Sequence, residues 1–168
     1  MSNNIKYIIL VIIFFILQAV WFNQVLLFGT YAPIIFLYPL LILPVYKNEI
    51  QSLFMAFLLG LGLDITNHTG GVFAATAVFV VYIRKFYFLI GKGPTQDLDQ
   101  IRVSNLGIAQ KVAYYFTFIF LSQLLIYGLE SFNLKLLISK LGYIFINSVL
   151  SLFFFILIDY LFFNTQNK

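Results

Sequence analysis

The chain has 168 residues, of which 62% are hydrophobic and only 10% are charged, and its formal net charge is +4. A soluble domain usually has about 45–50% apolar and about 25% charged residues, so this composition, arranged in long uncharged runs, indicates a protein that folds in a lipid bilayer. The sequence contains no cysteine, which excludes a disulfide framework, a thiolate metal site and a cysteine nucleophile.

The first apolar run covers residues 7–28, follows Lys6 and contains no charge. An apolar run after a basic residue is also typical of a signal peptide, but the apolar part of a signal peptide has only about 7–15 residues. This run is longer, and no small-x-small cleavage pattern follows it. We therefore predict a retained transmembrane helix. Gln18 lies within it, and we expect its amide to form interhelical hydrogen bonds, because an unpaired amide in hydrocarbon is costly.

Five further apolar segments follow, and we expect helices over residues 31–46, 50–66, 71–88, 112–129 and 141–163. A helix needs about 20 residues to cross about 30 Å of hydrocarbon, so the second to fourth segments are short. Pro33, Pro39 and Pro44 are expected to bend or break the second. The third and fourth form either two crossings or one re-entrant hairpin. We expect a single integral membrane domain over residues 1–168, an all-α bundle of six transmembrane helices.

The distribution of lysine and arginine sets the orientation, because these residues concentrate in cytoplasmic loops. With the N-terminus in the cytoplasm, eight of the ten basic residues lie inside: Lys6, Lys47, Arg84, Lys85, Lys92, Arg102, Lys111 and Lys168. Only Lys135 and Lys140 lie outside, in a half-apolar connection over residues 131–140 that we expect along the membrane interface. Both termini and the loop 91–110 are then cytoplasmic. Insertion explains the positive charge, so we expect contact with membrane lipid but no nucleic-acid partner.

Few side chains are available for catalysis. His68 is the only histidine, and the six acidic residues are scattered. A metal site or a catalytic carboxylate pair needs convergent ligands, and the sequence has no Gly-rich phosphate loop. We therefore expect no enzymatic activity, no cofactor and no metal site, and we interpret His68 as a solvated turn residue.

Small residues recur at a spacing of four on both sides of a short polar stretch around Asp64. Ala56, Gly60 and Asp64 share one helical face, and Gly71 and Ala75 share a face of the next helix. Because small residues let membrane helices approach backbone to backbone, this pattern predicts a tight hairpin with Asp64 near its outer turn. Two interpretations of Asp64 stay open. It either accepts hydrogen bonds from N–H groups at the start of the following helix, or it faces a partner at membrane depth.

A series of short motifs runs in order from about residue 17 to residue 150. They are LQ…W (Leu17, Gln18, Trp21), a proline that opens the second segment (Pro33), LP at its end (Leu43, Pro44), G…LD (Gly60, Leu63, Asp64), a glycine turn (Gly70, Gly71) and Asn147 in NSVL. In these motifs, in length and in helix count the chain resembles the bacterial rod shape-determining protein MreD family. It departs from that family in NHTGG, where a Ser-Gly-rich turn is more usual.

The resemblance implies a non-enzymatic scaffold of the cell-elongation (rod) complex in the bacterial inner membrane. MreD-like proteins associate with MreC, a membrane-anchored periplasmic protein, and through it with the actin-like MreB. They also associate with the glycosyltransferase and the transpeptidase that build lateral peptidoglycan. We therefore expect structural or partner-binding roles for Gln18, Pro33, Pro44, Gly60, Asp64, Gly70, Gly71 and Asn147.

The resemblance also supplies an alternative function. The MreD fold is similar to the six-helix substrate-binding components of energy-coupling-factor vitamin transporters. Those components dock on their transporter partner through small residues spaced by four on the first helix. Here the first helix has the single small residue Ala19 among bulky ones, which weakens the vitamin-binding alternative.

Overall fold

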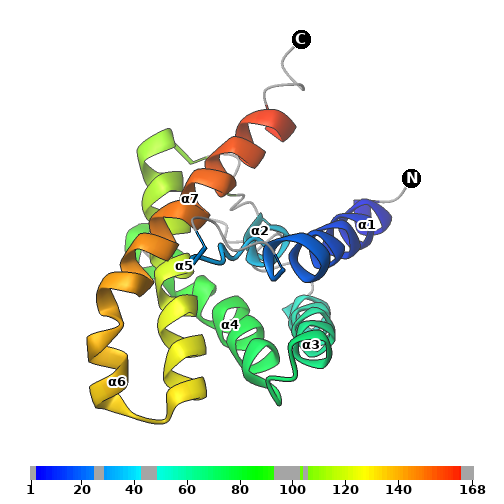
Figure 1. Ribbon diagram of the computed structural model, residues 1–168. Coiled ribbons are helices and arrows are strands. Elements are labelled where there is room, and N and C mark those ends of the chain that lie inside the picture. The colour runs from blue at the N-terminus through cyan, green and yellow to red at the C-terminus, as the bar shows by residue number, and fades with distance from the viewer. Residues whose placement is uncertain (1–2, 25–28, 43–48, 93–102, 104–105, 164–168) are drawn as a thin grey trace.

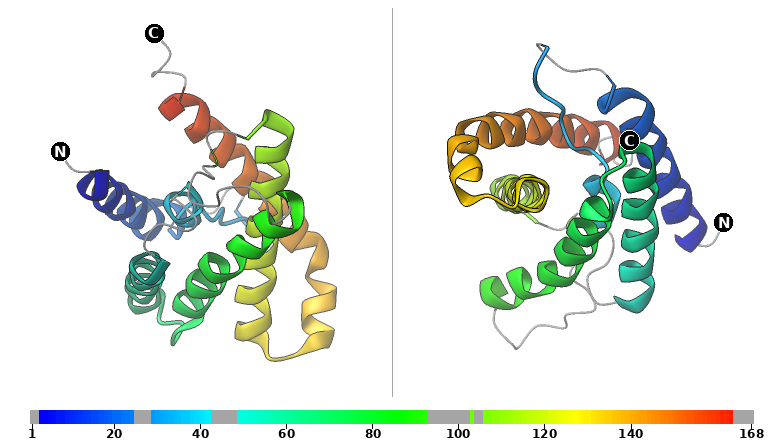
Figure 2. Two further views of the ribbon diagram at one scale, coloured as in Figure 1. Left: turned by 180° about the vertical axis from the view of Figure 1, so that it is seen from behind. Right: turned by 60° about the horizontal axis from the view of Figure 1, so that its bottom comes forward.

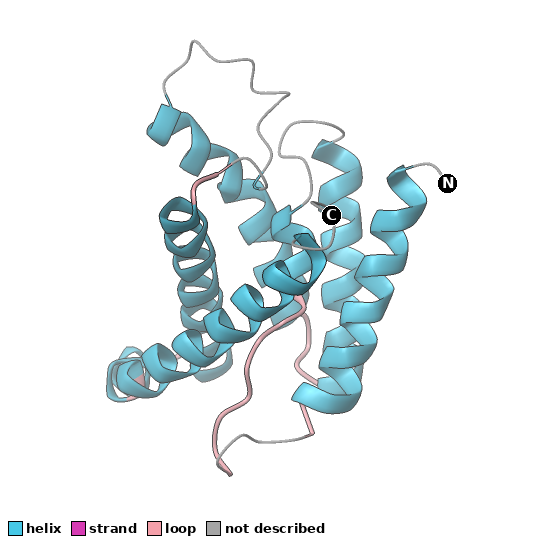
Figure 3. Cartoon of the chain, turned by 90° about the horizontal axis from the view of Figure 1, so that it is seen from above, coloured by secondary structure: helices cyan, strands magenta, loops and turns pink. Residues whose placement is uncertain are grey.

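The computed structural model describes residues 3–24, 29–42, 49–92, 103 and 106–163, and these residues form helices and loops without a β-strand (Figures 1 and 3). The helices in chain order are α1 (Asn3–Ile16), the π-helical turn η1 (Leu17–Phe22), α2 (Leu37–Ile42), α3 (Glu49–Asn67), α4 (Val72–Lys92), α5 (Ile108–Ser131), α6 (Leu134–Ser139) and α7 (Leu141–Phe163). The all-α fold predicted from the sequence is confirmed for the described part of the chain.

Three segments within the described residues are long and apolar enough to cross a membrane. They are Ile50–Asn67, Ile108–Ser131 and Leu141–Leu161. Large apolar side chains such as Ile12, Phe54 and Phe153 lie exposed on the helix surfaces. Lipid is a favourable solvent for such a surface and water is not, so the chain is a helical membrane protein.

Two antiparallel helix pairs make up most of the bundle, as Figures 1 and 2 show. α3 and α4 lie side by side and are joined by a tight turn, while α5 and α7 lie side by side and are joined through α6. α4 packs against α5, and α1 packs against α3. The short helix α2 lies at the centre and contacts both α1 and α4. The second segment of the chain is therefore the element around which the others assemble.

The helix predicted over residues 31–46 requires a correction, because only Leu37–Ile42 is helical among its described residues. Pro33 disfavours a helical conformation at Ala32, which accounts for the absence of helix at residues 31 and 32. Pro39 is tolerated because it lies in the first turn of α2, where backbone N–H groups have no intrahelical acceptor. Leu43 and Pro44 lie outside the described residues.

The other helices agree with the predicted segments, with shifts at their ends. α3 and α7 match closely, α4 continues past residue 88, and α5 begins at Ile108 rather than residue 112. The first segment is helical from Asn3 to Phe22, and residues 25–28 lie outside the described part. The connection between α5 and α7 contains α6, whose start is capped by Asn133 Oδ1 accepting from Lys135 N at 3.0 Å.

The most deeply buried stretch of the protein is α2 and the residues before it. Phe36, Leu37, Tyr38, Leu40 and Leu41 have no exposed surface. The Tyr38 ring stacks on Phe14 of α1 at a centroid distance of 5.2 Å and meets Phe155 of α7 edge-on at 5.3 Å. Each such aromatic pair contributes about 0.5–1.5 kcal/mol beyond the burial of its area. Helices far apart in the sequence thus share one core.

Candidate functional site

Gln18 holds the non-helical backbone that precedes α2. Its Oε1 accepts hydrogen bonds from Ile35 N at 2.7 Å and Phe36 N at 3.2 Å, and its Nε2 donates to Pro33 O at 3.3 Å. The side chain is only 1% exposed. A backbone polar group without a partner at membrane depth costs several kcal/mol. One glutamine therefore replaces, for this stretch, the hydrogen bonds that a helix would have made.

The same backbone is held from its other side by α7. Asn147 Nδ2 donates to Ala32 O at 3.0 Å, and Ser151 Oγ accepts from Ile34 N at 2.9 Å. The Ser151 hydroxyl also donates to Asn147 O, one turn earlier in its own helix. The predicted residues Gln18, Pro33 and Asn147 thus come together around the second segment.

A π-helical turn positions Gln18. Asn23 N donates to Gln18 O at 2.9 Å, which is a bond across five residues in place of the usual four. The Gln18 amide donates to Asn23 Oδ1 at 2.7 Å, and Asn23 Nδ2 donates to Asn67 Oδ1 at 3.0 Å. This chain of amides connects the second segment to the C-terminal end of α3, three residues beyond Asp64.

Asp64 lies in the last turn of α3 and binds the start of α4. Its Oδ1 accepts from Phe73 N at 2.9 Å and from Thr69 Oγ1 at 2.5 Å, and its Oδ2 accepts from Ala74 N at 2.8 Å. The first N–H groups of a helix have no intrahelical acceptor, and a negative charge there is also favoured by the helix dipole. Of the two interpretations left open by the sequence, the geometry shows the capping interaction, with both carboxylate oxygens engaged inside the hairpin.

Gly60 marks the closest approach of α3 to α4. A Cβ atom added there would lie 2.4 Å from Ala74 Cα and 2.7 Å from Phe73 O, so only glycine fits. Gly70 and Gly71 have φ angles of +65° and +105°, which the turn requires and which side chains other than hydrogen disfavour. Of the predicted hairpin residues, Gly60 therefore makes the contact between α3 and α4, and Gly70 and Gly71 form the turn. Asp64 lies between them in the sequence.

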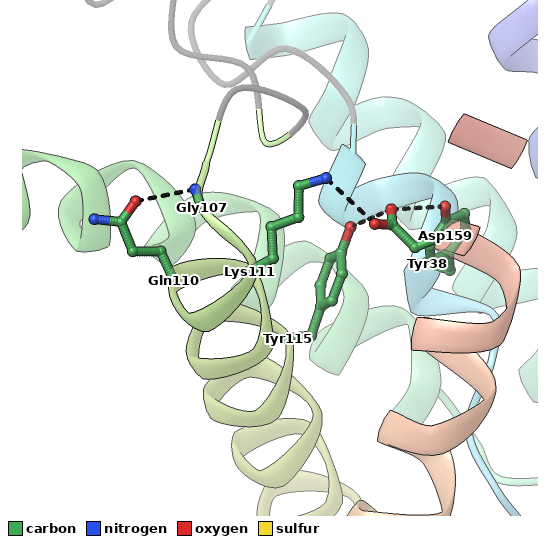
Figure 4. A network of polar contacts seen from close by, with 6 residues as sticks. All are labelled: Tyr38, Gly107, Gln110, Lys111, Tyr115 and Asp159. Atoms are coloured by element: carbon green, nitrogen blue, oxygen red, sulfur yellow. Dashed lines mark hydrogen bonds and ion pairs between the residues drawn. The ribbon is translucent and has the colours of Figure 1, made fainter. Parts of the chain in front are cut away.

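A second polar cluster, near the C-terminal end of α7, was not predicted. Asp159 Oδ1 accepts from Tyr115 OH at 3.1 Å and from Tyr38 OH at 3.3 Å, and Lys111 Nζ lies 3.3 Å from Oδ2 (Figure 4). The side chains of Lys111 and Asp159 are only 17% and 16% exposed. Since water reaches this pair little, removing one partner would leave an uncompensated charge within the protein. The cluster joins α2, α5 and α7.

Two more side chains bind the end of α2. Arg84 of α4 donates from Nη1 to Leu40 O, and Tyr114 of α5 donates to Leu41 O at 3.1 Å. The last carbonyls of a helix have no intrahelical donor, so these bonds satisfy groups that would otherwise be costly in the core. Arg84 is 1% exposed and Tyr114 is fully buried. Arg84 was missed because a cation near a predicted helix end is usually solvated in the cytoplasm, and Tyr114 was missed because its acceptor lies far away in the sequence.

Removing the Asp159 carboxylate should loosen α2 from α5 and α7. The variant Asp159→Leu takes the acceptor from two buried hydroxyls and from the Lys111 ion pair, and we expect a loss on the order of 3 kcal/mol. The double variant Lys111→Met/Asp159→Leu should regain part of that stability, because the ammonium is removed with its partner. Thermal unfolding in detergent micelles measures the stability of both variants. Equal midpoints for the single variant and the unchanged protein would contradict this role.

The described residues contain no group of three His, Cys, Asp or Glu side chains that could hold a metal ion. The fold and the polar clusters define a helical membrane protein built around a buried, partly non-helical second segment. Comparison with known proteins adds no family: no family model, no curated protein and no solved structure matches the chain.

Proposed function

We propose that the protein is a non-enzymatic scaffold of the cell-elongation complex in the bacterial inner membrane, similar to the MreD family. It binds an MreC-like partner and, with that partner, the glycosyltransferase and transpeptidase of lateral wall synthesis and the actin-like MreB. The observation that carries this proposal is the position in the fold of the residues that match the family motifs. Gln18, Pro33 and Asn147, which match widely separated family motifs, lie around one stretch of backbone, and Gly60 and Asp64, which match a single motif, both contact the start of α4. Shared contacts supply one physical reason for these motifs to occur together.

We further propose six crossings with both termini in the cytoplasm. Three contacts join helix ends that this topology assigns to the same side of the membrane. Asn23 after η1 binds Asn67 of α3, Tyr143 of α7 donates to Thr30 O, and Lys111 of α5 pairs with Asp159 of α7. These contacts support the alternation of helix directions that six crossings require.

The contacts that the interior polar side chains make favour a scaffold over a vitamin-binding component. A groove of about 550 Å³ lies between α1 and α3, but its lining is apolar apart from Gln51. Small-molecule sites usually combine an apolar lining with several convergent polar groups. The Gln18 amide, the Asp64 carboxylate and Asn147 Nδ2 bind the protein's own backbone instead. Partner contacts are then made by the outside of the bundle.

The test is depletion and co-purification in the host bacterium. Loss of the protein should turn rod-shaped cells round, and the tagged protein should co-purify with an MreC-like protein. Purified protein that retains a vitamin and binds an ATPase module, with cell shape unaffected by depletion, would contradict the proposal and favour the transporter alternative.

Asp64 variants separate structural from partner-binding roles in the same experiment. Asp64→Asn keeps one acceptor oxygen and Asp64→Ala keeps none, so membrane abundance should fall in the order unchanged protein, Asp64→Asn, Asp64→Ala. Co-purification per folded molecule should stay constant, because the carboxylate is occupied by α4. A variant with normal abundance but no partner binding would show instead that Asp64 contacts the partner.

A further inference from the structure

A cluster of tyrosines lies where α5 ends and α7 begins. The Tyr143 ring stacks on Tyr31 at 5.1 Å and meets Tyr127 edge-on at 5.5 Å, and its hydroxyl donates to Thr30 O at 2.8 Å. Tyrosine concentrates at the membrane–water boundary, because its ring suits the apolar side and its hydroxyl suits the polar side. The cluster therefore marks the depth of one membrane boundary.

α6 and the residues around it lie directly beyond this boundary. The flanking apolar spans end at Ser131 and begin again at Leu141, so the connection between them stays at the membrane surface. None of the α6 residues is buried in the protein. Leu134 and Ile138, four residues apart on one side of α6, are 78% and 66% exposed. At the surface of a membrane such side chains enter the boundary between headgroups and acyl chains.

Phe132 supports the same conclusion through its backbone. It ends α5 with a φ of +44°, a conformation that usually belongs to glycine at this position and that costs a bulky residue about 1–2 kcal/mol. Its side chain is 89% exposed, so packing within the protein does not offset that cost. Insertion of the ring among lipids would offset it.

Basic side chains complete the surface. Lys135 lies exposed on α6 next to the side that carries Leu134 and Ile138, and Ser139 follows it one turn later. Lys140, which follows α6, places Nζ 5.5 Å from the ring centroid of Tyr127 and also interacts with the Glu130 carboxylate at the end of α5. Glu130 offsets part of the Lys140 charge, so Lys135 is the stronger anion-binding group. A lysine near an anionic lipid surface contributes about 1 kcal/mol to binding.

We propose that residues 132–140, here named the surface helix, bind anionic phospholipids of the leaflet that they contact. Phe132, Leu134 and Ile138 insert between the headgroups, and Lys135 and Lys140 bind lipid phosphate. The surface helix then fixes the depth and tilt of the α5–α7 pair. This inference does not depend on the proposed scaffold function.

Insertion is tested with the full chain in vesicles. The sequence has one tryptophan, Trp21, which is replaced by Trp21→Phe so that a new indole can be placed by Phe132→Trp or Ile138→Trp. Each new indole should emit at shorter wavelength than in water and be quenched most by lipids brominated close to the headgroup. Ser139→Trp, on the polar side of α6, is the matched control and should be quenched less. Water-like emission without quenching at 132 and 138 would overturn the proposal.

The lipid preference has a separate readout. In equimolar phosphatidylglycerol and phosphatidylcholine, brominated phosphatidylglycerol should quench the indole at position 132 more than brominated phosphatidylcholine does. Lys135→Gln/Lys140→Gln should abolish this difference, and inorganic phosphate at the same concentration should leave it unchanged. Equal quenching by both lipids, loss of the preference in free phosphate, or a blue shift that appears only after a partner protein is added would each contradict the assignment.

Discussion

Replacing Gly60 with alanine should prevent α3 and α4 from packing and strongly reduce the amount of folded protein in the membrane. The added Cβ would lie 2.4 Å from Ala74 Cα, and a backbone atom cannot rotate away as a side chain can. The helices would have to separate, which stretches the bonds from Asp64 to Phe73 N and Ala74 N. We expect a loss of at least 1–3 kcal/mol, about the cost of overpacking a core, and membrane abundance and thermal midpoint both measure it.

Gly128→Ala is the matched control. Gly128 lies inside α5, and an added Cβ would meet no atom within 4 Å. Alanine is the better helix former, so this variant should be as stable as the unchanged protein or more stable by up to about 1 kcal/mol. If Gly60→Ala and Gly128→Ala gave the same abundance and midpoint, the close contact between α3 and α4 would not be needed for folding.

The hairpin could be predicted from the sequence because the residues that determine it lie close together in the chain. Gly60, Asp64, Gly70 and Gly71 lie within two consecutive helices and their turn, so helical spacing alone brings Gly60 to the contact face. The interpretation of His68 as a turn residue is compatible with its position, since it is exposed and has a φ of +57°. The pattern did not decide which groups Asp64 binds, because that depends on how far α4 is rotated.

The structure of the second segment could not be predicted in the same detail. Its prolines indicated a break, but the hydrogen bonds that make the break tolerable come from Gln18 in η1 and Ser151 in α7. Periodicity does not reveal which distant side chain will reach a given N–H group. The Asp159 cluster was missed for the same reason, since Tyr38, Lys111 and Asp159 belong to three separate segments. The sequence therefore predicted most of the helices but neither the non-local hydrogen bonds nor the short extent of the helix in the second segment.

Gln18→Leu should destabilise the protein more than any other polar substitution described above. It removes the acceptor of Ile35 N and Phe36 N and the donor to Pro33 O, while a leucine of similar volume keeps the cavity filled. An unsatisfied buried polar group costs about 1–3 kcal/mol, so three such groups together represent a loss on the order of 5 kcal/mol. Thermal unfolding in lipid nanodiscs gives the size of the effect.

Two further variants identify which interaction of Gln18 causes the loss of stability. Gln18→Glu in its uncharged form keeps an acceptor for Ile35 N and Phe36 N and has one O–H donor in place of the two N–H donors of Nε2, so it should fall between the unchanged protein and Gln18→Leu. Gln24→Leu changes an exposed glutamine two residues beyond the π-helical turn and should have little effect. Amide hydrogen exchange over residues 31–36 supplies the local readout, because exchange should accelerate only when Oε1 is lost. Unchanged protection in Gln18→Leu would mean that this backbone is held by its burial and by α7 alone, with Gln18 contributing only to packing.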